Sequence, residues 1–244
     1  MKIIGVIPAR YQSSRFPGKP LADICGKPMV WWVYHRAIKA EQISEVYVAV
    51  DDERVKEVCE KYNIPYVMTS KNHLTGVDRL VEVAQKVKAD RYILIQGDEP
   101  LLEPDTITEL VKEAAKADEN TVVTFKTLIH EPVDVVNFTI IKIVTDLKDL
   151  VLLASRSPIP YPKDSISIKY YKSVGVYSYP FSVLNIFPSL EIGPLEKAEG
   201  HDFMRLLENG IKVKAITHET ITISVDTPKD LERVRKIMGG QEPN

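Results

Sequence analysis

Cationic and small polar side chains are concentrated between residues 8 and 20, directly after an apolar run at residues 3–7. Arg10 and Arg15 supply forked N–H donors, Lys19 supplies a point charge, and two serines add hydroxyls. These groups suit the binding of phosphate, together with backbone N–H groups that small residues leave open. A solvated surface loop is the alternative. The position after a first buried strand favours the phosphate loop, because α/β proteins bind ligands at the carboxyl ends of their parallel strands.

Acidic residues stand at two other predicted strand ends. Asp98 and Glu99 follow the apolar run 91–95, and burying such a pair is costly unless it meets a cation. Carboxylate oxygens are ligands that Mg²⁺ prefers, so Asp98 is the first candidate metal ligand. Asp226 lies at a late strand-to-helix turn. Cations for a triphosphate and carboxylates for Mg²⁺ are what displacement at phosphorus requires, and the sequence therefore favours that chemistry.

A third polar stretch precedes an amphipathic helix. Gly76, Asp78 and Arg79 combine a small residue, an acid and a guanidinium at the expected mouth of that helix. Such a turn can recognise a polar ring or a phosphate through backbone amides and forked donors. Thr75 or Asp78 could instead cap the helix, and the two roles are compatible. His73 is expected to be an exposed loop residue.

Composition and missing motifs argue against several classes of protein. The 244 residues carry a formal net charge of -2, which offers no basic footprint, so nucleic acid is not an expected partner. Neither a GxxxxGKS/T loop nor GxGxxG occurs, which argues against P-loop NTPases and dinucleotide-binding dehydrogenases. Cys25 and Cys59 lack zinc-ligand spacing and are expected to be packed, reduced thiols. No signal peptide or membrane-spanning run is visible, so we expect a cytoplasmic protein without membrane insertion.

Apolar periodicity predicts an α/β fold. The predicted strands are 3–7, 46–50, 66–68, 91–95, 122–129, 138–146, 150–156, 170–179 and 211–218. The predicted helices are 28–40, 53–62, 80–89, 104–117, 181–187, 195–209 and one from 228 onward, which Thr227 or Asp226 would cap. Strands and helices alternate before about residue 120, which indicates a parallel, doubly wound sheet. Strands without intervening helices follow, so we expect antiparallel additions and a small lobe.

The segments IPARYQSSRFPGKPL, TGVDR, QGDEP, SRSPIPY, GVYSY, PLEKAE and VDTPKDLERVR resemble the CMP-Kdo synthetases, or 3-deoxy-manno-octulosonate cytidylyltransferases, in order and spacing. The resemblance covers essentially the whole chain. It implies a Rossmann-like mixed sheet of the nucleotide-diphospho-sugar transferase type. The implied nucleotide-binding core is 1–125 with 205–240, and the implied sugar-acid-binding and dimerisation lobe is 126–204. The implied activity uses Mg²⁺ and joins CTP to a 2-keto-3-deoxy sugar acid, giving a CMP-sugar and pyrophosphate in a homodimer.

Roles for individual residues follow from the same resemblance. The implied catalytic residues are Arg10, Lys19, Asp98 and Asp226, with Asp98 and Asp226 as the Mg²⁺ ligands. The implied nucleotide-binding residues are Ala9, Arg10, Ser14, Arg15, Lys19, Gly76, Asp78, Arg79 and Gln96. The implied or candidate sugar-binding residues are Gln96, Arg156, Ser173, Tyr177, His201 and Asp202.

The sequence departs from the family pattern on the sugar side. Ser173 stands where members usually have a His, and Phe203 replaces an amide in a usual LEQLR segment. Losing polar partners of sugar hydroxyls can change selectivity by orders of magnitude. Kdo, 8-amino-Kdo and a nonulosonate therefore all stay open as acceptors, and a non-catalytic nucleotide-binding regulator is the alternative from another class. His201 could replace the missing His or could be a half-exposed helix residue.

Overall fold

The computed structural model describes residues 1–13, 16–163, 168–220 and 222–239. The strands are β1 (Ile3–Ala9), β2 (Asp23–Ile24), β3 (Lys27–Pro28), β4 (Glu45–Val50), β5 (Tyr66–Met68), β6 (Arg91–Ile95), β7 (Val122–Leu128), β8 (Lys142–Thr145), β9 (Val151–Ser155), β10 (Tyr171–Pro180) and β11 (Val213–Thr217). The α-helices are α1 (Met29–Ala37), α2 (Glu53–Lys61), α3 (Gly76–Lys86), α4 (Pro104–Lys116), α5 (Pro132–Val136), α6 (Phe181–Ile186), α7 (Pro194–Glu199), α8 (Phe203–Glu208) and α9 (Pro228–Met238). Short 3-10 helices are η1 (Lys19–Leu21) and η2 (Phe187–Ser189).

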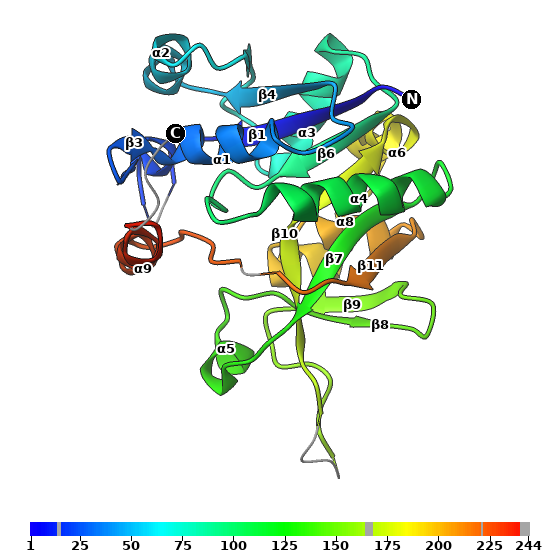
Figure 1. The fold of residues 1–244 in the computed structure, drawn as a ribbon. Coiled ribbons are helices and arrows are strands. Elements are labelled where there is room, and N and C mark those ends of the chain that lie inside the picture. Colours follow the sequence, from blue (N-terminus) through cyan, green and yellow to red (C-terminus); the bar gives the residue numbers. More distant parts are fainter. Residues whose placement is uncertain (14–15, 164–167, 221, 240–244) are drawn as a thin grey trace.

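A mixed sheet runs through the molecule between layers of helices (Figure 1). Within the described part of the chain, nine strands join it, in the order β11-β7-β10-β6-β1-β4-β5, with β8 paired to β10 and β9 to β8. β1 is parallel to both β4 and β6. β10 is antiparallel to β6 and β7, which confirms the expected change from a parallel to a mixed sheet.

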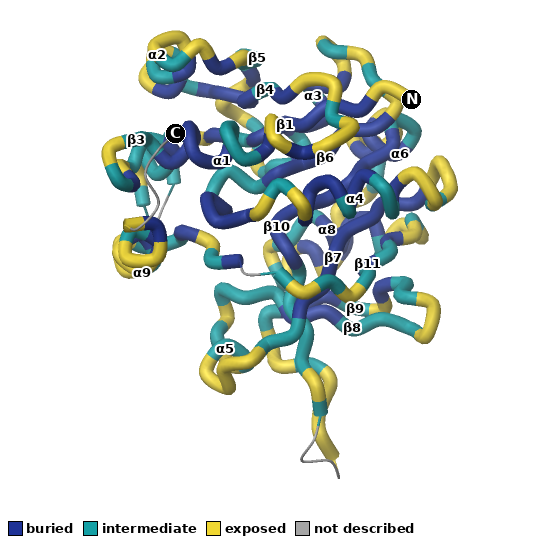
Figure 2. The backbone as a smooth tube through the Cα atoms, viewed as in Figure 1, coloured by how far each residue is buried: buried dark blue, intermediate teal, exposed yellow. Residues whose placement is uncertain are grey.

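The apolar run of β1 is buried on both faces of the sheet. Ile3 and Ile7 pack in a core with α1, whereas Ile4 and Val6 pack in a second core with α3. This alternation follows from the two-residue period of a strand. Figure 2 shows the central strands buried and exposed residues on the outer sides of helices such as α2 and α9. Burial on both faces fixes β1 and β6 side by side, so that their carboxyl ends open at the same edge.

Side-chain caps fix the starts of the two helices nearest that edge. Thr75 caps α3 and Thr227 caps α9, and in each helix the third residue, Asp78 or Asp230, bonds back to complete a capping box. The predicted caps by Thr75 and Thr227 are therefore confirmed. The predicted helix 80–89 begins earlier than expected, because the cap places Gly76 at the first helical position.

Three other predictions need correction. The single helix predicted at 195–209 is two helices, α7 and α8, because Gly200 adopts a left-handed conformation with φ of 62° and ends α7. The strand predicted at 138–146 begins only at Lys142, since residues before it form α5 and a turn. His73 is half-buried rather than exposed, with Nε2 2.5 Å from Glu82.

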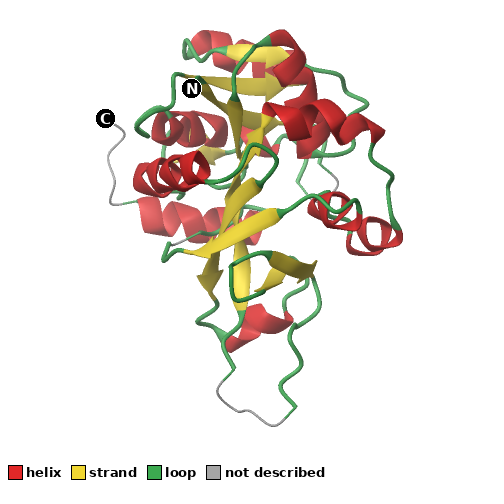
Figure 3. Cartoon of the chain, turned by 90° about the vertical axis from the view of Figure 1, so that its right-hand side faces the viewer, coloured by secondary structure: helices red, strands yellow, loops and turns green. Residues whose placement is uncertain are grey.

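The lower part of the molecule consists of α5, β8, β9 and the ends of β7 and β10 (Figures 1 and 3). β7 crosses the expected boundary between core and lobe, and β10, although within 126–204, pairs with β6 of the expected core. The division into core and lobe stays a prediction. In the described ranges, no helix combines the length and apolar character that crossing a bilayer needs.

Candidate active site

Two cavities meet at the carboxyl ends of β1 and β6. The first, of about 250 Å³, is called the β1 cavity, and its lining includes Arg10, Lys19, Gly76 and Arg79. The second, of about 240 Å³, is called the β10 cavity, and its lining includes Glu99, Asn137, Lys172, Ser173, Tyr177 and Arg233. Gln96, Asp98 and Asp226 line both cavities and form the junction between them.

Close backbone contacts build the junction. A Cβ on Gly97 would lie 2.3 Å from the Pro8 carbonyl oxygen, so only glycine lets the loop after β6 pass the end of β1. The Gln96 N–H donates to the Gly175 carbonyl at 2.9 Å, which ties this loop to β10. The Val225 N–H donates to the Asp98 carbonyl, also at 2.9 Å, and so brings the late segment alongside. These contacts place Asp226 next to Asp98, although the two are far apart in sequence.

Lys19 joins the two carboxylates of the junction. Its Nζ lies 2.6 Å from Asp98 Oδ2 and 3.3 Å from Asp226 Oδ1. Burial lowers the pKa of Lys19, but Asp98 and Asp226 outweigh that effect and leave the pKa raised. All three side chains are partly buried, so solvent screens their charges only in part. At the junction the structure thus brings together three of the four residues predicted to be catalytic.

The β1 cavity contains Arg10 and the start of α3. Arg10 Nη1 lies 3.5 Å from the Leu74 carbonyl, and Gly76 presents the first turn of α3 to the cavity. Arg79 lines the cavity too, but its guanidinium is already paired with Asp51 at 3.0 Å and bonded to Thr69 at 2.6 Å. Burial lowers the pKa of Arg79, which Asp51 partly offsets.

The structure describes three of the five other predicted nucleotide-binding residues. Gln96 lies at the junction, and Ala9 is buried at the end of β1. Asp78 completes the cap of α3 and lies outside both linings, with its Oδ1 3.7 Å from Arg205 Nη1. Ser14 and Arg15 lie outside the described residues.

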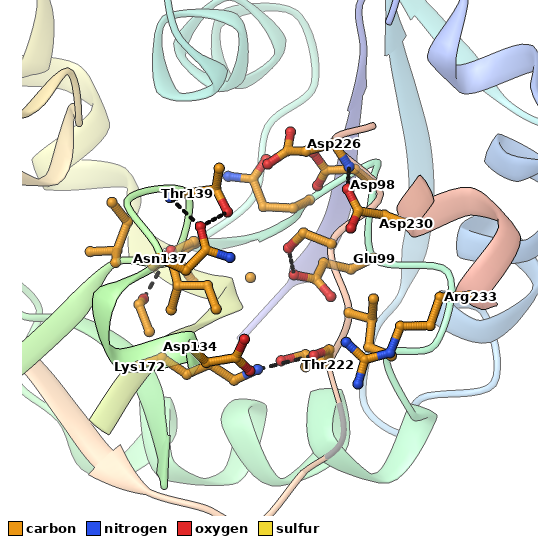
Figure 4. Close-up of a pocket in the computed structure, with 18 residues that line it drawn as sticks. Asp98, Glu99, Asp134, Asn137, Thr139, Lys172, Thr222, Asp226, Asp230 and Arg233 are labelled. Atoms are coloured by element: carbon orange, nitrogen blue, oxygen red, sulfur yellow. Dashed lines mark hydrogen bonds between the residues drawn. The ribbon is translucent and has the colours of Figure 1, made fainter. Parts of the chain in front are cut away.

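The β10 cavity is largely polar, and carboxylates, amides and hydroxyls face it (Figure 4). The Ser173 hydroxyl and the Tyr177 hydroxyl lie 3.1 Å apart, so these two predicted residues are together. Lys172 Nζ donates to the Thr222 carbonyl at 3.1 Å. Ser224 Oγ donates to buried Glu99, whose pKa is raised to about 7 by burial and by the neighbouring Asp98 charge.

Sequence reasoning did not name Asn137, Lys172 or Arg233, and it treated Glu99 only as a neighbour of Asp98. Lys172 precedes the predicted Ser173 on the same strand, and Arg233 follows the predicted Asp226 on the next helix. Proximity in sequence was therefore a usable signal for three of these four. Asn137 carried no such signal.

Three predicted sugar-binding residues line neither cavity in the described structure. Arg156 uses Nε for the Glu199 carbonyl at 2.8 Å and Nη1 for the Phe138 carbonyl at 2.9 Å. His201 Nδ1 accepts from the Phe203 N–H and lies 3.9 Å from Asp202 Oδ1. Phe203, which replaces the expected amide, is fully buried against Tyr177.

The donors at the junction suit Mg²⁺. Asp98 and Asp226 already converge on one cation, the Lys19 ammonium, and their ligand atoms are hard oxygens. Among residues 1–13, 16–163, 168–220 and 222–239, no group of three His, Cys, Asp or Glu side chains could hold a metal ion. A magnesium ion at the junction would therefore need further oxygen ligands from substrate phosphates and water, as is usual for this metal.

Comparisons with known proteins agree with this geometry. Residues 4–236 match the family described as "Cytidylyltransferase". The 3-deoxy-manno-octulosonate cytidylyltransferase of Geotalea uraniireducens is 43% identical over 96% of this chain and 98% of its own length. That of Escherichia coli is 40% identical, covering 97% and 96% respectively. The chain belongs to the 3-deoxy-manno-octulosonate cytidylyltransferase family.

Solved structures agree with membership of the 3-deoxy-manno-octulosonate cytidylyltransferase family. A CMP:2-keto-3-deoxy-manno-octonic acid synthetase complexed with CTP is 40% identical and matches with a TM-score of 0.93 over 99% of this chain and 100% of that one. A cytidylyltransferase from Leptospira borgpetersenii, 16% identical with a TM-score of 0.69, shares the fold. The expected mixed α/β fold is confirmed, and membership of this family makes the chain a nucleotidyltransferase.

Proposed function

We propose that the chain transfers CMP from CTP to the anomeric hydroxyl of a 2-keto-3-deoxy sugar acid, Kdo or a close relative, and releases pyrophosphate. One observation carries the proposal: the two cavities share Gln96, Asp98 and Asp226. A reaction between two substrates needs adjoining sites whose common wall stabilises charge on the transferred group. The synthetase complexed with CTP, so similar over its whole length, supports CTP as the nucleotide.

CTP would occupy the β1 cavity. Arg10 and Lys19 offer cationic donors there, and the first turn of α3 at Gly76 directs backbone N–H groups and a helix dipole toward an anion. Ser14 and Arg15, which lie between Arg10 and Lys19 in the sequence, are proposed to contact the triphosphate. Ala9, Asp78, Arg79 and Gln96 are proposed to shape the base and ribose side, with Arg79 held rigidly by Asp51.

Asp98 and Asp226 would hold Mg²⁺, which neutralises charge on the phosphates when it is bound. Lys19 now occupies the space between these carboxylates, and its ammonium is available to pair with the departing pyrophosphate once they bind the metal. Arg10 stabilises charge on the same phosphates. No covalent intermediate on the protein is needed, because the acceptor hydroxyl itself attacks the α-phosphorus.

The sugar acid would occupy the β10 cavity, beside Gln96, Ser173 and Tyr177. Their amide and hydroxyl groups match a polyhydroxylated acceptor. Arg156, His201 and Asp202 remain proposed sugar-side residues, close to this cavity in the fold but outside its lining. Ser173 and Phe203, which differ from the family pattern, favour testing 8-amino-Kdo and a nonulosonate beside Kdo.

The test is pyrophosphate release with CTP and Mg²⁺ against Kdo, 8-amino-Kdo and a nonulosonate, with UTP as the nucleotide control. Rapid release with CTP and Kdo supports the proposal. Release only with another acid would change the acceptor and keep the chemistry. If no acid gives pyrophosphate release although CTP raises the melting temperature, the proposal is overturned in favour of a nucleotide-binding regulator.

We also propose a homodimer in the cytoplasm. Val133, Val136 and Phe138, in and just after α5, are 68%, 67% and 70% exposed, and an apolar group of this kind suits contact with a second copy. The cytoplasm is where CTP is made and used. Sedimentation equilibrium would test the dimer, and a monomeric mass at micromolar concentration would contradict it.

A further inference from the structure

The turn at residues 137–140, between α5 and β8, forms one wall of the β10 cavity. Two cationic side chains that do not line the cavity donate hydrogen bonds to the carbonyl groups of this turn. Lys142 Nζ, fully buried, donates to the carbonyls of Asn137 at 2.8 Å and Ile140 at 2.7 Å. Arg156 Nη1 donates to the carbonyl of Phe138 at 2.9 Å. The wall is therefore rigid, because three of its four carbonyls are bound to buried or half-buried cations.

Within this wall, the orientation of the Asn137 carboxamide is fixed. Its Oδ1 accepts from the Thr139 N–H at 3.0 Å and from the Thr139 hydroxyl at 2.8 Å. A backbone N–H can only donate, so the atom facing it must be the oxygen and not the nitrogen. The amide nitrogen therefore points the other way, into the cavity, as Figure 4 shows. Nδ2 has no hydrogen-bond partner in the described part of the chain.

We propose that Asn137 is a specificity-determining residue, whose Nδ2 donates a hydrogen bond to one hydroxyl of the acceptor in the β10 cavity. The inference rests on the proposed function, since it needs a polyhydroxylated acceptor there. Lys142 and Arg156 are positioning residues, which act on the acceptor through the carbonyls of the turn. The acceptor gains a bond from Nδ2 without breaking one inside the protein, and the restrained turn loses little entropy on binding.

Asn137→Asp tests the inference, because the carboxylate still accepts both bonds from Thr139 but has no N–H to donate. We expect the KM for the acceptor to rise about tenfold, as for the loss of one hydrogen bond, with the KM for CTP unchanged. Asn120→Asp, the same change at an exposed residue before β7 and outside both cavity linings, is the matched control, with kinetics close to wild type. A melting temperature near that of wild type, raised normally by CTP, checks that the variants fold.

A panel of monodeoxy acceptors separates a lost hydrogen bond from charge repulsion. The Asn137→Asp penalty should vanish with one analogue, the one that lacks the bonded hydroxyl, and persist with the others. An equal penalty with every analogue would overturn the inference, as would an unchanged KM for the natural acceptor. If the wild-type protein releases no pyrophosphate with any of the acids, the proposed function is overturned, and this inference with it.

The positioning role of Arg156 has its own test. If Arg156 acts through the turn, Arg156→Ala and Asn137→Asp remove the same interaction with the acceptor. The acceptor KM of the double variant should then rise by less than the product of the two single-variant increases. If the increase in the double variant equals that product, Arg156 acts independently of Asn137, by a direct contact with the acceptor, and its positioning role is overturned. Lys142 is unsuitable here, because removing a buried side chain would destabilise the fold.

Discussion

Among single residues, Lys19, Asp98 and Asp226 dominate the chemistry of the junction. Two carboxylates this close repel one another unless a cation lies between them, and Lys19 supplies that cation. Mg²⁺ would compete for the same oxygens. Binding of substrate and metal can therefore displace Lys19 from the two carboxylates. Before binding, Lys19 holds these carboxylates close together, so they are preorganised for the metal.

Replacing one of these carboxylates tests its role as a metal ligand. Asp98→Asn should lower turnover by at least about 10³-fold, because the amide is a far weaker ligand for a divalent cation. Its stability should change by less than about 1 kcal/mol, since Lys19 keeps its pair with Asp226. The measurements are steady-state pyrophosphate release and the melting temperature. Asp105→Asn, an exposed acid at the start of α4, is the control with unchanged activity, and an active Asp98→Asn enzyme would remove the metal assignment.

The sequence predicted these charged residues because acids and cations at strand ends are costly without a ligand or a partner. It also placed Tyr177 and Ser173 on one strand, where they meet. It could not reveal that Arg156 bonds to two backbone carbonyls, because backbone acceptors leave no trace in the residue types. For the same reason it passed over Asn137, whose orientation depends on a turn that the apolar pattern did not predict.

Among the elements, α3 fixes the loop that borders the β1 cavity. Glu82, on α3, accepts from the Ser70 N–H at 2.8 Å and from Lys86 Nζ at 2.6 Å, and its Oε2 lies 2.5 Å from His73 Nε2. Burial alone would raise the pKa of Glu82, but these hydrogen bonds lower it from its usual 4.5 to about 2. The folded protein thus stabilises the charged form of Glu82.

Glu82→Gln should therefore destabilise the protein in a pH-dependent way. A folded pKa below the unfolded pKa gives stability that is present above about pH 4.5 and lost as the pH falls toward 2. We expect a loss of about 1 kcal/mol at pH 7, allowing for solvent screening, and none near pH 2. Urea unfolding at several pH values measures this.

Two further comparisons sharpen the Glu82→Gln experiment. Glu113→Gln removes a surface pair with Lys116 on α4 and should cost less than about 0.5 kcal/mol. Because Leu74 and Thr75 line the β1 cavity, the KM for CTP should rise in Glu82→Gln and stay unchanged in Glu113→Gln. An equal loss for Glu82→Gln at pH 2 and pH 7 would contradict this role of the charge.

The irregular part of β10 makes a second element-level prediction. A Cβ on Gly175 would lie 2.8 Å from Glu99 Cγ, so the buried Glu99 side chain would have to shift from its present position. Gly175→Ala should cost about 1–3 kcal/mol and raise the KM for the acceptor, because Glu99 lines the β10 cavity. Gly5→Ala in β1, 3.1 Å from Val46 Cγ2, is the control that loses stability without changing either KM. An unchanged acceptor KM in Gly175→Ala would contradict the prediction.

Element prediction succeeded where one apolar period persisted and failed where a single residue interrupted it. The alternating pattern before residue 120 gave the parallel half of the sheet. Gly200 breaks the segment 195–209 into two helices, since its left-handed conformation ends α7 although the apolar spacing continues. Pro132 starts α5 at a place where β-branched residues favoured a strand on either side.

In the whole molecule, segments far apart in sequence meet at one edge of the sheet. The N-terminal loop, the loop after β6 and the segment before α9 each contribute one charged residue to the junction (Figure 1). The mixed sheet and its parallel half were predictable from pattern. The pairing of two cavities was not, because it depends on how β10 lies beside β6 and on the contact between Val225 and Asp98.

The most direct test of this arrangement is a crystal structure with Mg²⁺, Kdo and a CTP analogue carrying a methylene group between the α and β phosphorus atoms. We predict the nucleotide in the β1 cavity, Mg²⁺ on Asp98 and Asp226, and the acceptor in the β10 cavity with its anomeric hydroxyl toward the α-phosphorus. A nucleotide bound in the β10 cavity, or an acceptor bound away from the junction, would contradict the assignment of the two cavities.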